Sequence, residues 1–344
     1  MSCRAVLAVG LLSAAGVHGA PRDGGPCTGQ EDLLAIRGKW TTRADVGGSG
    51  IPAGDRAEVK ARLDRIAKLF LSAYPEPRGV EAAWYRALDA RPLLRSQHAY
   101  GFQSLYLEWA CNPGVHRMLL GDETGTWAYA FVNHLGWFAD QQKELTVEGH
   151  PTYFLTRRSG EFGGLPAYEG IHTQSSNTGA SFSRAILVTR PGSSALLPVT
   201  RKEFLEAYLG AVEARIAPLI ANIEKSSTDP TRKATAVAQR REQIAHLQQR
   251  ARVRLASLSP AEAGEPALLT YGDLFDFKDF ATEERGGRAL VRLDRRYFEA
   301  KVPAYVPRFA VVYWRWQRSV PSEAFRAEFE RRFDPAALAA LLDR

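Results

Sequence analysis

Residues 195–225, ALLPVTRKEFLEAYLGAVEARIAPLIANIEK, contain the clearest structural signal in this chain of 344 residues. The first five residues are an apolar run of the strand type. Thr200 and Glu203 then have the spacing of a capping box, in which a hydroxyl and a carboxylate each accept a hydrogen bond from a free backbone N–H at the start of a helix. The sequence therefore predicts a short strand followed by a long helix.

This predicted helix has two apolar faces when its residues are placed at about 100° intervals. The large side chains of one face are Phe204, Leu205, Tyr208, Val212, Ile216, Leu219, Ile220 and Ile223. The other face carries Ala207, Gly210, Ala211, Ala214, Ala217, Pro218 and Ala221. We expect the large residues to cover a sheet and the small residues to let a second helix approach closely.

The second helix follows directly, so the sequence predicts a long helical hairpin at residues 200–258. Ser226–Pro230 has loop composition, and residues 231–258 return to a helical pattern. An apolar seam on this second helix is expected to fill the small-residue face of the first. The seam residues are Ile244, Leu247, Ala251 and Leu255.

The second helix also carries most of the positive charge of the chain. It contains seven basic residues and one acidic residue, which gives +6, whereas the whole chain has a net charge of +7. The arginines surround the helix instead of lining one side, which does not fit a helix lying on a membrane. We expect them to cover the packed seam, to pair with glutamates of the first helix, or to contact a polyanion. The candidate polyanion contacts are Arg240, Arg241, Arg250, Arg252 and Arg254.

The periodicity of the remaining sequence predicts an α+β fold, with a mainly antiparallel sheet packed by helices. Residues 55–74 and 80–88 have apolar residues at helical spacing, and Asp55 with Glu58 resembles a second capping box. Residues 99–199 change to a period of two and are rich in aromatics, which predicts an antiparallel meander.

Changes in composition divide the chain into five segments. They are a signal peptide at 1–20, an extension and loop at 21–54, an α+β core at 55–258, a linker at 259–266 and a C-terminal region at 267–344. The C-terminal region has two more strand patterns and two helical patterns, and it either forms a small lobe or completes the same sheet.

The N-terminus predicts export to the periplasm or the medium. Arg4 precedes a short apolar stretch that ends in the small residues Gly19 and Ala20, as a cleaved signal peptide does. Cleavage would leave Cys27 and Cys111 as the remaining cysteines, and in an oxidising compartment we expect them to form a disulfide. No other stretch is apolar enough to span a membrane.

The sequence contains no recognisable catalytic, cofactor or metal motif. The weak candidates for a catalytic site are His150, Glu169 and His172, because two imidazoles and a carboxylate could supply acid and base. No cofactor and no metal is predicted. Two functions therefore remain: a non-enzymatic envelope protein that binds an anionic polymer or a partner protein, and a hydrolase of envelope material. Nucleic acid is not an expected partner of an exported protein.

The C-terminal half resembles a family of secreted bacterial envelope proteins that have no assigned activity. The resemblance rests on Pro198–Phe204 before the long helix, and on four motifs further along the chain. These are Tyr297-Phe298, Val302-Pro303, Pro307-Arg308-Phe309 and Val312–Trp316. It implies an envelope location and adds no site residue.

Overall fold

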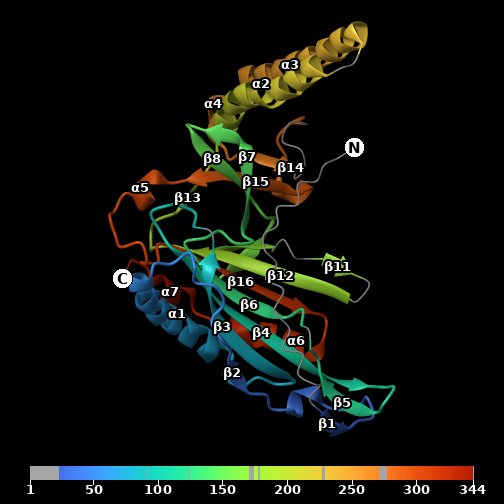
Figure 1. The fold of residues 1–344 in the computed structure, drawn as a ribbon, viewed down its shortest axis with the longest axis vertical. Helices are drawn as coiled ribbons and strands as arrows, with labels where there is room; N and C mark the ends of the chain where they lie inside the picture. Colours follow the sequence, from blue (N-terminus) through green and yellow to red (C-terminus); the bar gives the residue numbers. More distant parts are fainter. Residues whose placement is uncertain are drawn as a thin grey trace.

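The computed structural model describes residues 23–90, 92–122, 124–169, 174–176, 179–226, 229–270 and 277–343. These residues form a large sheet, a smaller sheet and a helical hairpin, arranged one after another along the long axis of the molecule (Figure 1). The fold is α+β, with antiparallel sheets packed by helices and a helical hairpin in the C-terminal half, as predicted. The predicted signal peptide lies outside the described residues.

The large sheet has the strand order β1-β5-β4-β6-β16-β12-β10-β9, with β3 and β2 continuing from β4, and β11 beside β12. Its strands are β1 (Asp23–Pro26), β2 (Trp40–Thr42), β3 (Val80–Ala90), β4 (Ala99–Asn112), β5 (Arg117–Leu120), β6 (Trp127–Val132), β9 (Arg158–Phe162), β10 (Leu165–Glu169), β11 (Gln174–Ser176), β12 (Gly179–Val188) and β16 (Ala310–Gln317). The C-terminal strand β16 lies between β6 and β12, so the C-terminal region contributes to the middle of this sheet.

Three helices cover one face of the large sheet: α1 (Ala53–Ala73), α6 (Val320–Arg332) and α7 (Pro335–Ala339). Phe70 of α1 is fully buried and packs against Phe329 and Phe333 of the C-terminal segment. The predicted capping box of α1 is wrong. The helix begins earlier, after Pro52, and Asp55 instead pairs with His98 at 2.7 Å.

Residues 80–88, predicted as a helix, form strand β3. Its side chains alternate: Ala82, Trp84 and Leu88 pack in the core beneath the helices, whereas Ala83, Tyr85 and Ala87 lie on the other face. Apolar residues occur here at intervals of two and of four, which fit both a strand and a helix. The long antiparallel pairing with β4 decides in favour of the strand.

The smaller sheet has the order β13-β15-β8-β7, with β14 beside β15. Its strands are β7 (Ala139–Val147), β8 (His150–Leu155), β13 (Leu196–Pro198), β14 (Leu268–Thr270) and β15 (Gly287–Leu293). The prediction of one continuous meander is therefore wrong. Most pairings are antiparallel as expected, but β7 and β8 leave the large sheet to pair with the later strand β15, which lies far away in sequence.

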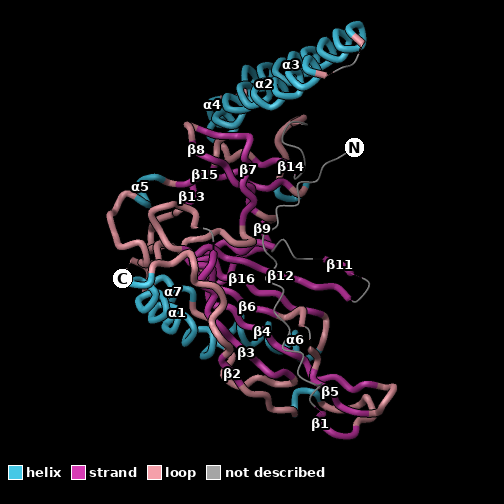
Figure 2. The backbone as a smooth tube through the Cα atoms, viewed as in Figure 1, coloured by secondary structure: helices cyan, strands magenta, loops and turns pink. Residues whose placement is uncertain are grey.

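The helical hairpin consists of α2 (Arg201–Lys225) and α3 (Pro230–Ser257), and it projects away from both sheets (Figure 2). The predicted capping box of α2 is present: Glu203 N–H donates to Thr200 Oγ1, and Thr200 N–H donates to the Glu203 carboxylate. The predicted linker after α3 is partly wrong, because it contains the short helix α4 (Pro260–Gly264) with its own capping box at Ser259.

The expected role of the small-residue face of α2 is wrong for most of that face, although Ala207 and Ala211 pack against the buried cluster of the hairpin. Gly210 and Ala214 are exposed, and a Cβ atom built on Gly210 would meet no neighbouring atom. The large face instead both covers the smaller sheet and contacts α3. Its first residues pack on the smaller sheet, and Val212 and Ile216 share a buried cluster with Leu247 and Ala251 of the predicted α3 seam.

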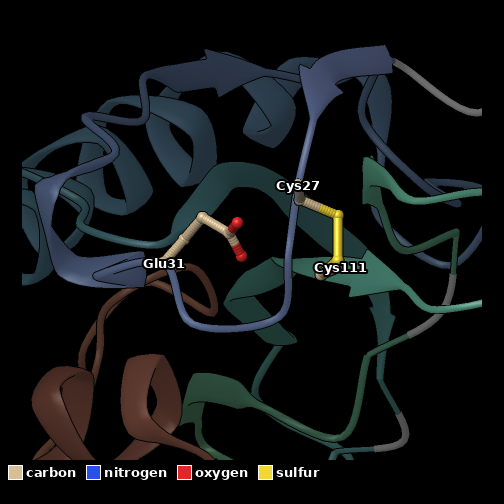
Figure 3. Close-up of side chains that lie close together, drawn as sticks. All are labelled: Cys27, Glu31 and Cys111. Carbon is tan, nitrogen blue, oxygen red and sulfur yellow. A yellow bond between two sulfur atoms is a disulfide. The ribbon is translucent and has the colours of Figure 1, made fainter.

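The predicted disulfide is present between Cys27 and Cys111, and it ties the segment after β1 to the end of β4 (Figure 3). Glu31 lies beside it, and its carboxylate accepts hydrogen bonds from the backbone N–H groups of Thr28 and Gly29. Among the residues that the structure describes, these three form the one group of His, Cys, Asp and Glu side chains close enough to hold a metal ion. Because both sulfur atoms are in the disulfide, the group is not a metal site.

The elements that remain are short connections: the 3-10 helices η1 (Leu33–Ala35) and η3 (Glu283–Arg285), and α5 (Arg295–Phe298). Within the described part of the chain, no helix is both long enough and apolar enough to cross a membrane. A disulfide fits the oxidising compartment that the sequence predicts.

Candidate functional site

The weak catalytic candidates lie on different sheets. His150 begins β8 in the smaller sheet, and Glu169 ends β10 in the large sheet. The Glu169 carboxylate accepts a hydrogen bond from Arg157 and raises the pKa of that guanidinium. His172 lies outside the described residues. The described geometry therefore gives the catalytic prediction no support, and it leaves the role of His172 as a prediction.

A different histidine has the most altered environment. Burial lowers the pKa of His134 to about 4, and its Nδ1 accepts a hydrogen bond from Gly136 N–H at 2.9 Å. The ring packs edge-on against Phe131. His134 is therefore a neutral, structural residue that stabilises the turn after β6, because neither a carboxylate nor a nucleophile faces it among its described contacts.

The predicted polyanion contacts on α3 divide into two groups. Arg254 forms ion pairs with Asp279 at 2.8 Å and Glu262 at 3.6 Å, and Arg250 donates to the Phe277 carbonyl oxygen at 2.9 Å. These two arginines attach the base of the hairpin to the residues that follow α3. The expected pairing of α3 arginines with glutamates of α2 is absent from the described ion pairs.

The remaining three candidates are available to a ligand. Arg240, Arg241 and Arg252 are exposed, and none forms an ion pair with a described residue. Arg240 and Arg252 donate only to the neutral side chains of Gln243 and Gln248 on the same helix.

Among its described residues, the outer part of the hairpin has none that is buried. Ile216 is the last buried residue of α2, and Leu247 is the first buried residue of α3. The part between them, residues 217–246, is here called the arm. Since α2 continues for nine residues beyond Ile216, the arm extends about 14 Å past its last buried contact at the rise of an α-helix.

A groove with a volume of about 460 Å³ lies between the two helices of the arm. Its lining residues are Leu219, Asn222, Ile223, Ser226, Arg232, Lys233, Ala236 and Arg240. Three of them are cations and none is a carboxylate. Leu219 is 44% exposed and adds apolar surface to this lining. The groove thus combines positive charge with exposed apolar surface.

Sequence reasoning identified one residue of this groove, Arg240, as a contact. It missed Arg232 and Lys233, although both belong to the same basic helix, and it assigned Leu219 to the buried face. The exposure of Leu219 could not be known from the helical spacing alone.

Comparison of the chain with family models, curated proteins and solved structures finds no match. A functional assignment therefore rests on the geometry of the chain itself.

Proposed function

We propose that this protein is a non-enzymatic binding protein of the cell envelope, and that its arm contacts an anionic polymer. The observation that supports this proposal is the groove of the arm. Arg232, Lys233 and Arg240 line it together with the exposed apolar side chain of Leu219, beyond the last buried contact of the hairpin.

The charges of the arm suit a polymer better than a single small anion. A contact between one exposed cation and one anion contributes at most about 1 kcal/mol, because water and salt screen it. A polymer that carries a phosphate or carboxylate on each unit can contact the groove together with Arg241 and Arg252, so several weak contacts add up. The apolar groove wall, with Leu219, adds a contribution that salt does not weaken.

Binding to poly(glycerol phosphate) immobilised on a sensor surface tests the proposal. We expect the double variant Arg232→Glu/Arg240→Glu to lose at least tenfold in affinity, and the affinity of the unchanged protein to fall as salt rises from 50 to 300 mM. The matched control is Arg65→Glu/Lys68→Glu, which changes the net charge equally on the exposed side of α1.

Two results would refute the proposal. One is an equal loss of affinity in both double variants, which would mean that net charge alone attracts the polymer. The other is no measurable binding by the unchanged protein at 50 mM salt.

A further inference from the structure

The large sheet has a second face, opposite α1, α6 and α7, where strand register brings aromatic and polar side chains together. Tyr85, Gln103, Tyr129 and Tyr313 lie directly opposite one another on β3, β4, β6 and β16. The next row on the same face contains Leu105, Trp127, Arg315 and Ser183. Side chains paired in this way have Cβ atoms about 5 Å apart.

The aromatic residues of β6 form a ladder along this face. The rings of Trp127 and Tyr129 are stacked with centroids 5.9 Å apart, and those of Tyr129 and Phe131 are stacked at 5.4 Å. Trp137 packs edge-on against Tyr129 at 4.9 Å and against Tyr313 at 5.0 Å. Trp127, at one end of the ladder, is half-buried and its indole N–H donates to the Thr124 carbonyl oxygen, which holds the ring in place.

Arg315 lies directly opposite Trp127 and has no counter-ion in the described structure. Its Nη2 donates to Ser181 Oγ at 3.0 Å, its Nε is buried without a hydrogen-bond partner, and it forms no ion pair. A guanidinium has five N–H donors, and Arg315 uses one of them. The carboxylate on this face, Glu81, lies on β3 and accepts a hydrogen bond from Lys39 N–H.

Gln103 and Tyr85 extend the polar part of this face. The Tyr85 hydroxyl donates to Gln103 Oε1. Neither N–H group of the Gln103 side-chain amide donates to a described residue. Arg43, which is exposed, lies close enough to Tyr85 for its charge to act on that hydroxyl. The unused polar groups of Arg315 and Gln103 are N–H donors, which favours a ligand rich in acceptor oxygens.

We propose that this face binds an acidic sugar unit, with its carboxylate on Arg315 and its ring on Trp127. A half-buried cation that lacks a counter-ion is completed by an anion, and a planar guanidinium matches a carboxylate with two parallel hydrogen bonds. A pyranose ring has an apolar C–H face that packs on an indole, and its hydroxyl oxygens accept from Gln103. An acidic peptide would satisfy Arg315 but would leave the half-buried ring of Trp127 without a matching flat surface.

Titration calorimetry with tetragalacturonate tests this proposal. The control ligand is its methyl ester, which has the same sugar rings without the charges. We expect the unchanged protein to bind the acid at least tenfold more tightly than the ester. Arg315→Gln removes this difference, Arg315→Lys keeps part of it, and Arg318→Gln, the matched control at an exposed position just after the same strand, keeps all of it.

The proposal is overturned if acid and ester bind equally, if neither binds, or if Arg315→Gln keeps the preference while its melting temperature is unchanged. It is also overturned if tetraglutamate binds as tightly as tetragalacturonate, since the ligand would then be an acidic peptide. The arm variant Arg232→Glu/Arg240→Glu should bind tetragalacturonate normally, so failure of this site and failure of the proposed function are distinguishable.

Discussion

The stability of the protein should depend on pH through His134. Burial lowers its pKa from the ordinary value of 6.5 to about 4, and its Nδ1 must remain unprotonated to accept from Gly136 N–H. Above pH 6.5 the ring is neutral in both the folded and the unfolded chain, so it causes no pH dependence. Between pH 6.5 and 4 the unfolded chain takes up the proton and the folded chain does not, so the free energy of unfolding falls as the pH falls.

The size of this effect follows from the two pKa values. The difference between 6.5 and about 4, at 1.36 kcal/mol for each pKa unit, corresponds to about 3 kcal/mol at full development. Below pH 4 both states are protonated, and the effect of His134 stops growing.

Urea unfolding of the unchanged protein and of His134→Asn between pH 7.5 and 3.5 isolates this contribution. The asparagine side-chain oxygen can accept from Gly136 N–H and does not titrate, so other groups cancel in the difference between the two proteins. We expect that difference to shift by about 3 kcal/mol in favour of the variant as the pH falls from 6.5 to 4. A difference that stays constant over this range, or an NMR titration that places the His134 pKa near 6.5, would refute the reasoning.

Two further predictions concern packing and a buried ion pair. Leu247→Ala should lower the free energy of unfolding by about 2–5 kcal/mol, because Leu247 is buried at the base of the hairpin. Ala214→Leu, on the exposed face of α2, should change it by less than about 0.5 kcal/mol. Thermal denaturation of both variants checks this order, and the reverse order would mean that the small residues of α2 do form the contact with α3. Asp343→Asn should lower the free energy of unfolding by about 3–5 kcal/mol, because it leaves Arg308 without its counter-ion. Arg308 is 1% exposed and pairs with Asp343 at 2.8 Å. Urea denaturation that finds a loss below about 1 kcal/mol would contradict this prediction.

The hairpin illustrates how far sequence could predict the fold. The start of α2 was predictable because a capping box depends on residues three apart, and the seam of α3 was predictable because helical spacing is local. The orientation of α2 was not. Both of its faces are apolar, so helical spacing does not say which face is buried. The large face packs inward because Val212 and Ile216 make more contact with the sheet and with α3 than the small residues could.

The candidate sites were predicted less completely than the fold. Arg240 was recognised from the charge of α3, but the groove also needs Leu219 from α2, which lies beyond Ile216, the last buried residue of that helix. The predicted roles of Arg250 and Arg254 as polyanion contacts are weakened by their contacts with Phe277, Asp279 and Glu262, which lie beyond the end of the helix. Contacts between segments so far apart leave no periodic pattern in the sequence.

By itself, the sequence determined the local features: the α+β class, the hairpin, most strands of the sheets and the pairing of Cys27 with Cys111. These follow from short-range spacing, or from there being two cysteines beyond the predicted signal peptide. Tertiary structure alone decided that residues 80–88 are a strand, and that Arg315 lies opposite Trp127. The physical reason is that a strand's hydrogen-bond partners come from other parts of the chain, so its state and its neighbours depend on which strand pairs with it.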